Sequence, residues 1–333
     1  MRRFNQNPGN NPRHDRGQRH NQPHPNRHQS ARSGPPQNRP QDDGERRFLQ
    51  GVAVDPTPRI RLENGSKELT MRAMDLMCPI GMGQRGLIVA PPGSGKTTFL
   101  KHICSSVAAA YPEVKLYCLL IDERPEEVTD FRRGVQAEVR WSSSDEDYEH
   151  HIRTADELMH QVYREVGNGA NVMVVIDSLT RLSRVHNAEM RSGGRTMSGG
   201  VDARALEVPR RIFGSARKIE NGGSLTILAT ILVDTGSRMD QVIFEEFKGT
   251  GNMEIVLSRE ISNRRIYPAI DIPKSNTRKV ELLMEPEELE RSSRLRRILV
   301  DEGTVEATST LVELLQKFPT NKELLATMKN EVD

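Results

Sequence analysis

The feature of the sequence that most constrains the fold is the segment VAPPGSGKTT, residues 89–98. It follows a short apolar run, residues 87–90, and leads into residues 97–111, where apolar side chains recur at helical spacing. A strand, a glycine-rich loop and a helix in this order form a phosphate-binding loop, because backbone N–H groups at a helix N-terminus converge on phosphate oxygens. The segment predicts a nucleotide site within an α/β fold.

The loop departs from the usual pattern G-x-x-x-x-G-K-[ST], because Ala90 stands where the first glycine is expected. We expect Ala90 to end the strand, where a methyl group is tolerated. Lys96 then supplies a compact positive charge for the phosphates, and Thr97 supplies a hydroxyl for Mg²⁺. The nucleotide-binding residues predicted in the loop are Gly93, Ser94, Gly95, Lys96, Thr97 and Thr98.

Further apolar runs alternate with helical stretches such as residues 151–166. The runs are VKLYCLLID (114–122), VMVVIDS (172–178), SLTILATILVD (224–234) and NMEIVLS (252–258). Continuous β-branched runs of this kind are typical of a parallel sheet that is buried on both faces. Ligands of such sheets bind at the carboxyl ends of the strands. We therefore expect one cleft, shared by the loops after Ala90, Ile121, Ile176 and Leu232.

Acidic residues end two of these runs, and a triphosphate site needs one acid for the metal and one to polarise the attacking water. Asp177 is the candidate for the metal side. Glu123 is the candidate base, and its neighbour Asp122 competes for that role. Either acid alone could be an ordinary helix cap, but two such acids beside a phosphate loop favour catalysis.

Residues 1–47 contain ten Arg, no Lys and four acids, which gives a formal charge of +6, whereas the whole chain carries +2. The segment has little apolar area to bury, so it is interpreted as a disordered arm before a globular region, residues 48–333. A basic arm favours contact with RNA or DNA, because each Arg that neutralises a phosphate releases counterions. The alternative is a solubilising tail. Its four histidines have nothing to fix a ligand geometry, so they do not predict a metal site.

The three cysteines, Cys78, Cys104 and Cys118, form an odd set without CxxC spacing, which predicts neither a disulfide framework nor a zinc site. The apolar runs are far shorter than the roughly 18 residues of a membrane span, and the Arg-rich start lacks the apolar stretch of a signal peptide. A cytoplasmic protein without a membrane partner is expected.

Longer motifs carry a family resemblance. PIGMGQRGLIVAPPGSGKT, LIDERPEEVTDFRR, VIDSLTRLSR, EEFKGTGNMEIVLSR and RRIYPAIDIPKSNTRK closely resemble the motor domain of the bacterial transcription termination factor Rho family. The resemblance runs from about Asp55 to Lys329. It implies a RecA-like fold and a ring of six copies, with ATP and Mg²⁺ bound between subunits and single-stranded RNA pulled through the centre. It also implies a role in transcription termination, with RNA polymerase and elongation factors as partners.

The resemblance assigns roles residue by residue. It makes Glu123 the catalytic glutamate and Arg278 an arginine finger that reaches into the neighbouring subunit's site, with Arg181 as a second arginine near the γ-phosphate. Tyr267 matches an aromatic residue that stacks on adenine, and Arg124 lines the nucleotide pocket. The same pocket would include a turn formed by Gly81, Met82, Gly83, Gln84, Arg85 and Gly86.

Two segments resemble the family's RNA-binding loops in the pore of the ring. The first, RSGGRTMSGGVD, is glycine-rich and basic, and its predicted RNA contacts are Arg195, Thr196 and Ser198. Arg195 stands where relatives often carry Lys, which keeps the charge but changes the geometry of phosphate contact. The second, FKGTGN, predicts contacts from Lys248, Gly249 and Thr250.

The sequence also departs from the family. Relatives carry a helical segment and an OB-fold module before the motor, whereas here the motor follows the arm almost directly. We hypothesise that the arm replaces that module as an RNA tether. Gly93-Ser94 stands where relatives often have Lys-Ala, which removes one charge near the phosphates. Two alternatives to an RNA motor remain: a ring-forming regulator that uses ATP as a conformational ligand, and a DNA-directed RecA-like ATPase.

Overall fold

The computed structural model describes residues 43–191 and 200–328, and within them one large sheet organises the fold. Six parallel strands form its centre. In spatial order they are β10 (Met253–Val256), β4 (Arg85–Ala90), β9 (Ser224–Leu232), β7 (Asn171–Asp177), β5 (Lys115–Glu123) and β6 (Glu138–Ser143). The predicted α/β class with a mostly parallel sheet is confirmed, and the five strands expected from the apolar runs all belong to it.

Short antiparallel strands complete the sheet. β11 (Asn276–Thr277) pairs with β10, while β8 (Arg217–Ile219) pairs with both β9 and β1 (Ala53–Val54). A separate two-stranded ribbon joins β2 (Arg59–Ile60) to β3 (Ile80–Gly81). This ribbon leads directly into β4, so it fixes where the central strand enters the sheet.

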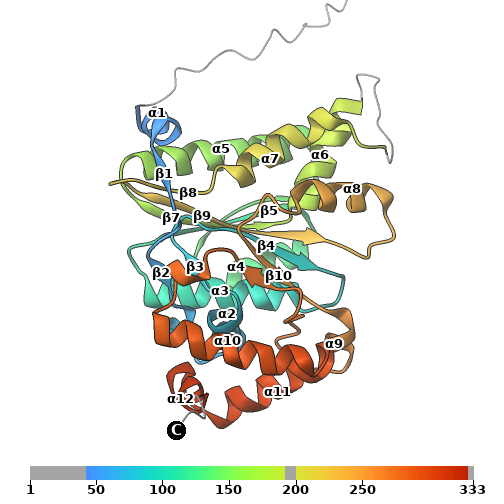
Figure 1. Ribbon diagram of the computed structural model, residues 1–333. Coiled ribbons are helices and arrows are strands. Elements are labelled where there is room, and N and C mark those ends of the chain that lie inside the picture. The colour runs from blue at the N-terminus through green and yellow to red at the C-terminus, as the bar shows by residue number, and fades with distance from the viewer. Residues whose placement is uncertain (1–42, 192–199, 329–333) are drawn as a thin grey trace, which may run out of the picture. The chain divides into compact units, whose positions relative to one another are not determined.

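Two layers of helices cover the sheet, because alternate side chains of each strand point to opposite faces. Ile88 and Ala90 of β4 pack into one core, and Leu87 and Val89 pack into the other. The first core is covered by α2 (Leu69–Met77), α3 (Lys96–Ala110) and α4 (Pro125–Gly134). The second is covered by α5 (Tyr148–Gly167), α6 (Leu179–Arg191), α7 (Glu207–Gly214) and α8 (Arg238–Phe247). Figure 1 shows α5, α6 and α7 on one side of the sheet and α2 and α3 on the other.

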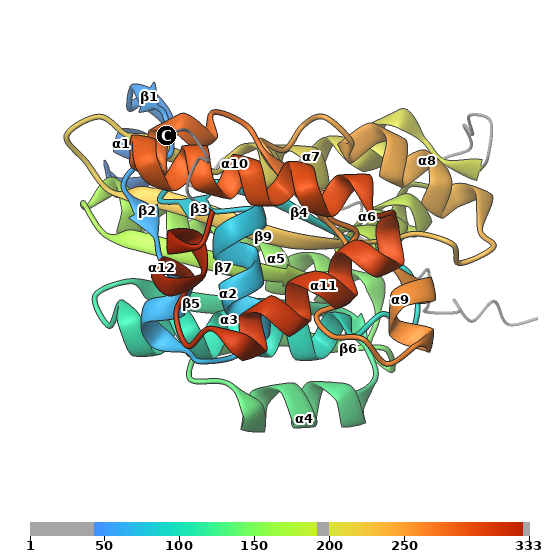
Figure 2. The same cartoon turned by 60° about the horizontal axis from the view of Figure 1, so that its bottom comes forward.

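The C-terminal helices form an additional layer over α2 and α3, which Figure 2 brings to the front. They are α10 (Pro286–Asp301), α11 (Thr304–Lys317) and α12 (Asn321–Ala326). The short α9 (Arg259–Asn263) packs near α11 through Ile261 and Val305. Three single 3₁₀ turns, η1 (Leu62–Gly65), η3 (Ala203–Leu206) and η4 (Val280–Leu282), link these elements.

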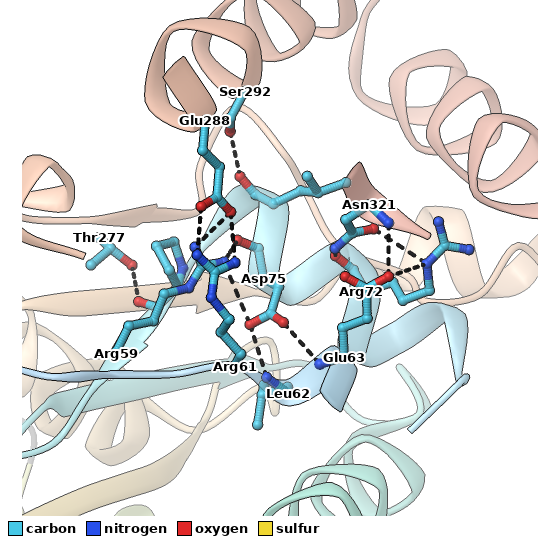
Figure 3. Close-up of polar contacts among 12 residues, drawn as sticks. Arg59, Arg61, Leu62, Glu63, Arg72, Asp75, Thr277, Glu288, Ser292 and Asn321 are labelled. Atoms are coloured by element: carbon cyan, nitrogen blue, oxygen red, sulfur yellow. Dashed lines mark hydrogen bonds and ion pairs between the residues drawn. The ribbon is translucent and has the colours of Figure 1, made fainter. Parts of the chain in front are cut away.

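A buried polar network holds this layer against the start of the fold (Figure 3). Glu288 of α10 accepts hydrogen bonds from Arg59 at 2.7 Å and from Arg61 at 3.1 and 2.7 Å. Asp75 of α2 accepts the backbone N–H groups of Leu62 and Glu63. Burial raises the pKa of Asp75 to about 6, although Arg59, 3.8 Å away, favours the charged form.

The first described helix, α1 (Asp43–Gln50), includes residues 43–47, which the sequence analysis assigned to the arm. Phe48 stacks on Tyr163 of α5 with ring centroids 4.8 Å apart, and Arg47 Nε donates to the carbonyl of Gly167 at 3.0 Å. These partners lie far along the chain, so composition alone did not reveal the helix. The rest of the predicted arm, residues 1–42, lies outside the described residues. None of the described helices is long and apolar enough to span a bilayer.

Candidate functional site

The glycine-rich loop connects β4 to α3, as the sequence predicts. Ala90 is the last residue of β4 and is fully buried, so its position needs no glycine. Gly93 and Gly95 have φ angles of +78° and +88°, a region that side-chain-bearing residues rarely adopt. Ser94 is buried, and its hydroxyl donates to the carbonyl of Pro91 at 2.8 Å. The loop thus opens its backbone toward the N-terminus of α3.

Lys96, the first residue of α3, meets the end of the sheet at Asp177. Its Nζ donates to both carboxylate oxygens of Asp177 at 2.5 Å. Thr230 of β9 donates its hydroxyl to the same carboxylate at 2.7 Å. The ends of β4 and β7 and the last residues of β9 therefore bring their side chains together at the carboxyl edge of the sheet, where ligands of parallel sheets bind.

Glu123 ends β5 and lies on the other side of Lys96, with Oε1 3.7 Å from Nζ. The register of β5 against β6 shifts between Ile121 and Glu123, and Asp122 between them has φ +56°. Such a bulge re-aims the following side chain. Glu123 is consequently 3 % exposed and faces Lys96, whereas the side chain of Asp122 is 31 % exposed. The geometry favours Glu123 over Asp122 as the base.

The pKa of Glu123 is raised to about 7. Burial is the main cause, and the nearby negative charge of Asp177 adds to it, while Lys96 and Arg181 oppose the shift. A carboxyl group with a pKa near 7 changes protonation state at neutral pH, as a general base requires. Two carboxylates on either side of one lysine form the charged centre of the site.

Arg181 contacts this centre, and Arg124 directly follows Glu123 along the chain. Arg181, on α6, places Nη2 3.1 Å from Glu123 Oε2, and its Nη1 donates to the backbone carbonyl of Asp122. Its Nε is buried without a hydrogen-bond partner among the described residues. Arg124 precedes α4, is largely exposed and lies 3.8 Å from Glu127. Arg181 thus holds the candidate base, and Arg124 is free to turn toward a ligand.

Tyr267 lies against the loop itself. A Cβ atom added to Gly95 would come within 3.3 Å of the Tyr267 ring, so the aromatic side chain and the glycine loop are in close approach. Half of the Tyr267 surface is exposed. An exposed aromatic face beside a phosphate loop suits a nucleobase.

The residues expected to hold Mg²⁺ are Asp177 and Thr97. Hard divalent cations prefer oxygen ligands, and both side chains offer oxygen at the start of α3 and the end of β7. The Thr97 hydroxyl has no hydrogen-bond partner within the described residues. Among the described residues, no group of three or more His, Cys, Asp or Glu side chains is arranged so that it could hold a metal ion by itself. The donors present fit a cation that also binds nucleotide oxygens and water, as Mg²⁺ does.

A second group of predicted residues lies at the other end of β4. The turn from Gly81 to Gly86 enters the strand, whereas the phosphate loop leaves it after Ala90. At roughly 3.3 Å per residue, the two ends of β4 are about 16 Å apart. Arg278 also lies at this entry end, directly after β11. The turn and Arg278 are therefore separated from the phosphate loop of the same subunit by the length of β4. The assignment of the turn to the nucleotide pocket stays a prediction.

The predicted RNA-binding segments also separate. Arg195, Thr196 and Ser198 lie outside the described residues. The chain beyond them returns to α6, where Asn187 Nδ2 donates to the carbonyl of Gly200 and lies 4.0 Å from the sulfur of Met239 in the first turn of α8. Lys248, Gly249 and Thr250 follow the last turn of α8, about 15 Å away along the helix.

Sequence reasoning missed two residues that organise the site. Thr230 holds Asp177 from the middle of an apolar run, where only its hydroxyl distinguishes it from its neighbours. Asn252 joins the turn that contains Gln84 to the segment of Arg278, through contacts described below. Thr230 lies in no motif, and the motif FKGTGN, which ends at Asn252, gives no sign of the contacts that Asn252 makes across the sheet. The roles of both residues therefore become visible only in the fold.

The fold and the site define a phosphate-loop nucleotide-binding domain. The family model for the nucleotide-binding domain of the ATP synthase alpha/beta family matches residues 70–277. Two solved structures share the fold. An ATPase from the type III secretion system of pathogenic bacteria has a TM-score of 0.68 at 22% identity, covering 83% of this chain and 85% of that one. EscN from the type III secretion system of enteropathogenic E. coli has a TM-score of 0.66 at 23% identity, covering 84% and 72%.

Closer relatives identify the family. Transcription termination factor Rho from Haemophilus influenzae is 50% identical over 274 residues, which are 81% of this chain and 65% of the relative. Rho from Pseudomonas aeruginosa is 50% identical over 279 residues, which are 83% of this chain and 67% of the relative. This chain belongs to the transcription termination factor Rho family. It spans about two thirds of the length of these relatives.

Proposed function

We propose that this protein is an RNA-dependent ATPase that moves on single-stranded RNA and acts in transcription termination. One observation carries the proposal: the acids and lysine of an ATPase site gather at one edge of the sheet, while Arg278 lies at the opposite edge. A site divided in this way is complete only when a second copy supplies the missing arginine. Head-to-tail contact of this kind, repeated through a closing rotation, produces a ring. We propose a ring of six copies, as the family resemblance implies.

In the proposed reaction the chain's own residues bind the nucleotide and direct water. The glycine loop and Lys96 hold the phosphates, and the exposed ring of Tyr267 stacks on adenine. Lys96 exchanges its contact with Asp177 for the phosphates when nucleotide enters. Mg²⁺, when bound through Asp177 and Thr97, supplies charge neutralisation of the β- and γ-phosphates. Glu123 accepts a proton from the attacking water, which lines up with the γ-phosphate.

Arginines stabilise the negative charge of the transition state. Arg181 lies in the same subunit next to Glu123, and Arg278 is contributed by the neighbour. An arginine finger supplied in this way is worth about 10³ to 10⁵ in rate. Hydrolysis is thereby coupled to the relative position of two subunits, which is what a translocating ring needs.

RNA contact is proposed for residues 192–199 together with the start of α8. The exposed Arg238 begins that helix, and the neighbouring Met239 lies beside Asn187, which contacts the returning chain at Gly200. We propose that Lys248, Gly249 and Thr250 contact the same RNA, and that the exposed Arg238 adds a positive charge at the start of α8. One such charge per subunit grips phosphates without reading bases. We propose a cytoplasmic location, with RNA polymerase and elongation factors as partners.

The steady-state rate of ATP hydrolysis, measured with single-stranded RNA and in parallel with DNA of the same sequence at fixed salt, tests the proposal. We expect RNA to stimulate hydrolysis several-fold more than DNA. Equal stimulation by DNA would favour a DNA-directed ATPase. ATP binding and ring formation without RNA-stimulated turnover would favour a regulator that uses ATP as a conformational ligand.

A further inference from the structure

The contacts at the entry end of β4 centre on Asn252, which immediately precedes β10. Its Oδ1 accepts two hydrogen bonds, from Gln84 Nε2 at 2.6 Å and from the backbone N–H of Arg85 at 2.9 Å. Its backbone N–H donates to the carbonyl of Arg85 at 3.0 Å. Its backbone carbonyl accepts the N–H of Arg278 at 2.9 Å. One residue thus ties the start of β4 to Arg278.

Gln84 makes this connection rigid. Its side chain is fully buried, and its Oε1 accepts the backbone N–H of Gly81 at 3.1 Å. Its backbone carbonyl accepts the N–H of Ile227 in β9 at 2.9 Å. A buried amide with both ends bonded has one favourable orientation, because turning it would leave a donor and an acceptor unsatisfied. Gln84 therefore anchors Asn252 to the centre of the sheet.

The arginines at this edge form no ion pair among the described residues, although Arg278 lies close enough to Glu254 to oppose the burial that raises the pKa of that carboxyl group. Arg217 and Arg278 are close enough to lower the pKa of Arg85, together with burial, which has the largest effect. Arg85 Nε is buried without a hydrogen-bond partner among the described residues. Within those residues no carboxylate lies within 4.0 Å of Arg85, Arg217 or Arg278. Positive charges gathered in this way favour an anionic partner.

We propose that Asn252 is a positioning residue that presents Arg278 and Arg85 together to the phosphates of a nucleotide held by a second copy of this chain. The inference rests on the proposed ATPase. Arg278 is exposed, and the hydrogen bond from its backbone N–H to Asn252 fixes the position of its Cα atom. The long side chain therefore extends outward from a fixed point on the backbone. Because the side-chain amide of the same residue accepts the backbone N–H of Arg85, the backbones of both arginines keep a fixed position relative to β4. Asn252 touches neither nucleotide nor water and acts through the two arginines.

Asn252→Ala removes the acceptor for Gln84 and Arg85 and is expected to lower kcat about 10- to 100-fold, with KM for ATP changed less than about twofold. Asn252→Asp keeps both accepted hydrogen bonds but places a carboxylate beside the arginines, so it folds normally and gives a similar defect. The matched control is Asn171→Ala at the start of β7, whose Oδ1 accepts the Ser224 hydroxyl at 2.8 Å. This control removes a comparable bond at the same edge, away from Arg278, and should keep wild-type turnover.

Rings assembled from two kinds of variant subunit distinguish two explanations of the defect. Either Asn252 acts on the nucleotide site of the neighbouring subunit, or its substitution damages the subunit that carries it. Lys96→Ala subunits lack a working phosphate loop but keep an intact Asn252. When they are mixed with Asn252→Ala or Asn252→Asp subunits in equal amounts, about a quarter of the interfaces combine a good loop with good arginines. We expect turnover to recover toward that fraction. Recovery absent for both variants, in rings confirmed to be mixed, would overturn the proposal.

Nucleotide affinity tests the same inference without relying on hydrolysis, so the test can still be made if the wild-type protein has no ATPase activity. The affinity for a fluorescent, non-hydrolysable ATP analogue should increase as wild-type protein is concentrated into rings, because the neighbour's arginines then reach the phosphates. Both Asn252 variants should match wild type when dilute and lose that increase. An increase retained by Asn252→Asp, or a loss of affinity in dilute protein, would overturn the inference whatever the outcome for the proposed function.

Discussion

Glu123→Gln is expected to slow hydrolysis strongly and, at the same time, to stabilise the protein. The Glu123 side chain is almost fully buried, and its pKa is raised from the ordinary 4.5 to about 7. The folded state therefore disfavours the charged carboxylate, so stability is lost as the pH rises from about 4.5 to about 7. Glutamine resembles the protonated acid and avoids this cost.

The size of the effect follows from the pKa difference. At about 1.36 kcal/mol for each pH unit, ionising Glu123 in the folded protein costs about 3 kcal/mol at pH 8. At pH 5 the acid is mostly protonated in the folded state, and the cost is below about 1 kcal/mol. Urea titrations of nucleotide-free protein should show the Gln variant more stable by these amounts, with an unchanged dependence on urea. Loss of a general base should lower kcat about 10²- to 10⁴-fold while nucleotide binding persists.

Asp122→Asn is the matched control, since it alters the adjacent and more exposed acid and leaves its backbone contact with Arg181 in place. It should retain hydrolysis. A Gln variant no more stable than wild type at pH 8, or one whose advantage does not shrink at pH 5, would refute the electrostatic reasoning. Normal hydrolysis by Glu123→Gln would refute the assignment of the base and redirect attention to Asp122.

Four further outcomes are expected. Lys96→Ala should weaken ATP binding by at least about 10-fold, because a charged hydrogen bond to phosphate is worth about 1.5–3 kcal/mol. Titration calorimetry measures this affinity, and an unchanged value would contradict the role of Lys96 in binding the phosphates. Asp75→Asn loses one accepted backbone hydrogen bond at every pH, but its stability relative to wild type should improve by about 2 kcal/mol between pH 4 and pH 7.5, because the folded pKa of Asp75 is raised from 3.8 to about 6. The kcat should be unchanged, and a pH-independent difference in urea titrations would argue against this reasoning. Lys248→Ala and Arg238→Ala should each reduce the salt dependence of RNA binding by about one phosphate contact, and an unchanged salt slope for either variant would remove that residue from the RNA path. Removal of residues 1–42, which leaves α1 intact, should weaken RNA binding and reduce the slope of log affinity against log salt concentration. An unchanged slope would show that the arm does not act as an RNA tether.

Local sequence determined the catalytic edge of the sheet. Each strand there carries its chemical residue at its own end: Lys96 follows β4, Glu123 ends β5 and Asp177 ends β7. Because parallel strands leave the sheet at a common edge, reading the end of each apolar run was enough to bring these residues together. The register shift that favours Glu123 over Asp122 is a property of strand pairing, so the sequence left that choice open.

Tertiary structure alone decided which residues could share a subunit's site. The turn from Gly81 to Gly86 precedes the phosphate loop by only a few residues, yet β4 carries the two to opposite edges of the sheet. Arg278 is close to that turn because β11 pairs with β10 and β10 pairs with β4, and Asn252 bonds to both segments. A motif indicates which side chains a reaction needs. The direction of each strand and its pairing within the sheet determine at which edge of the sheet those side chains lie. Those pairings join segments far apart in the chain, and for that reason no local pattern could give them.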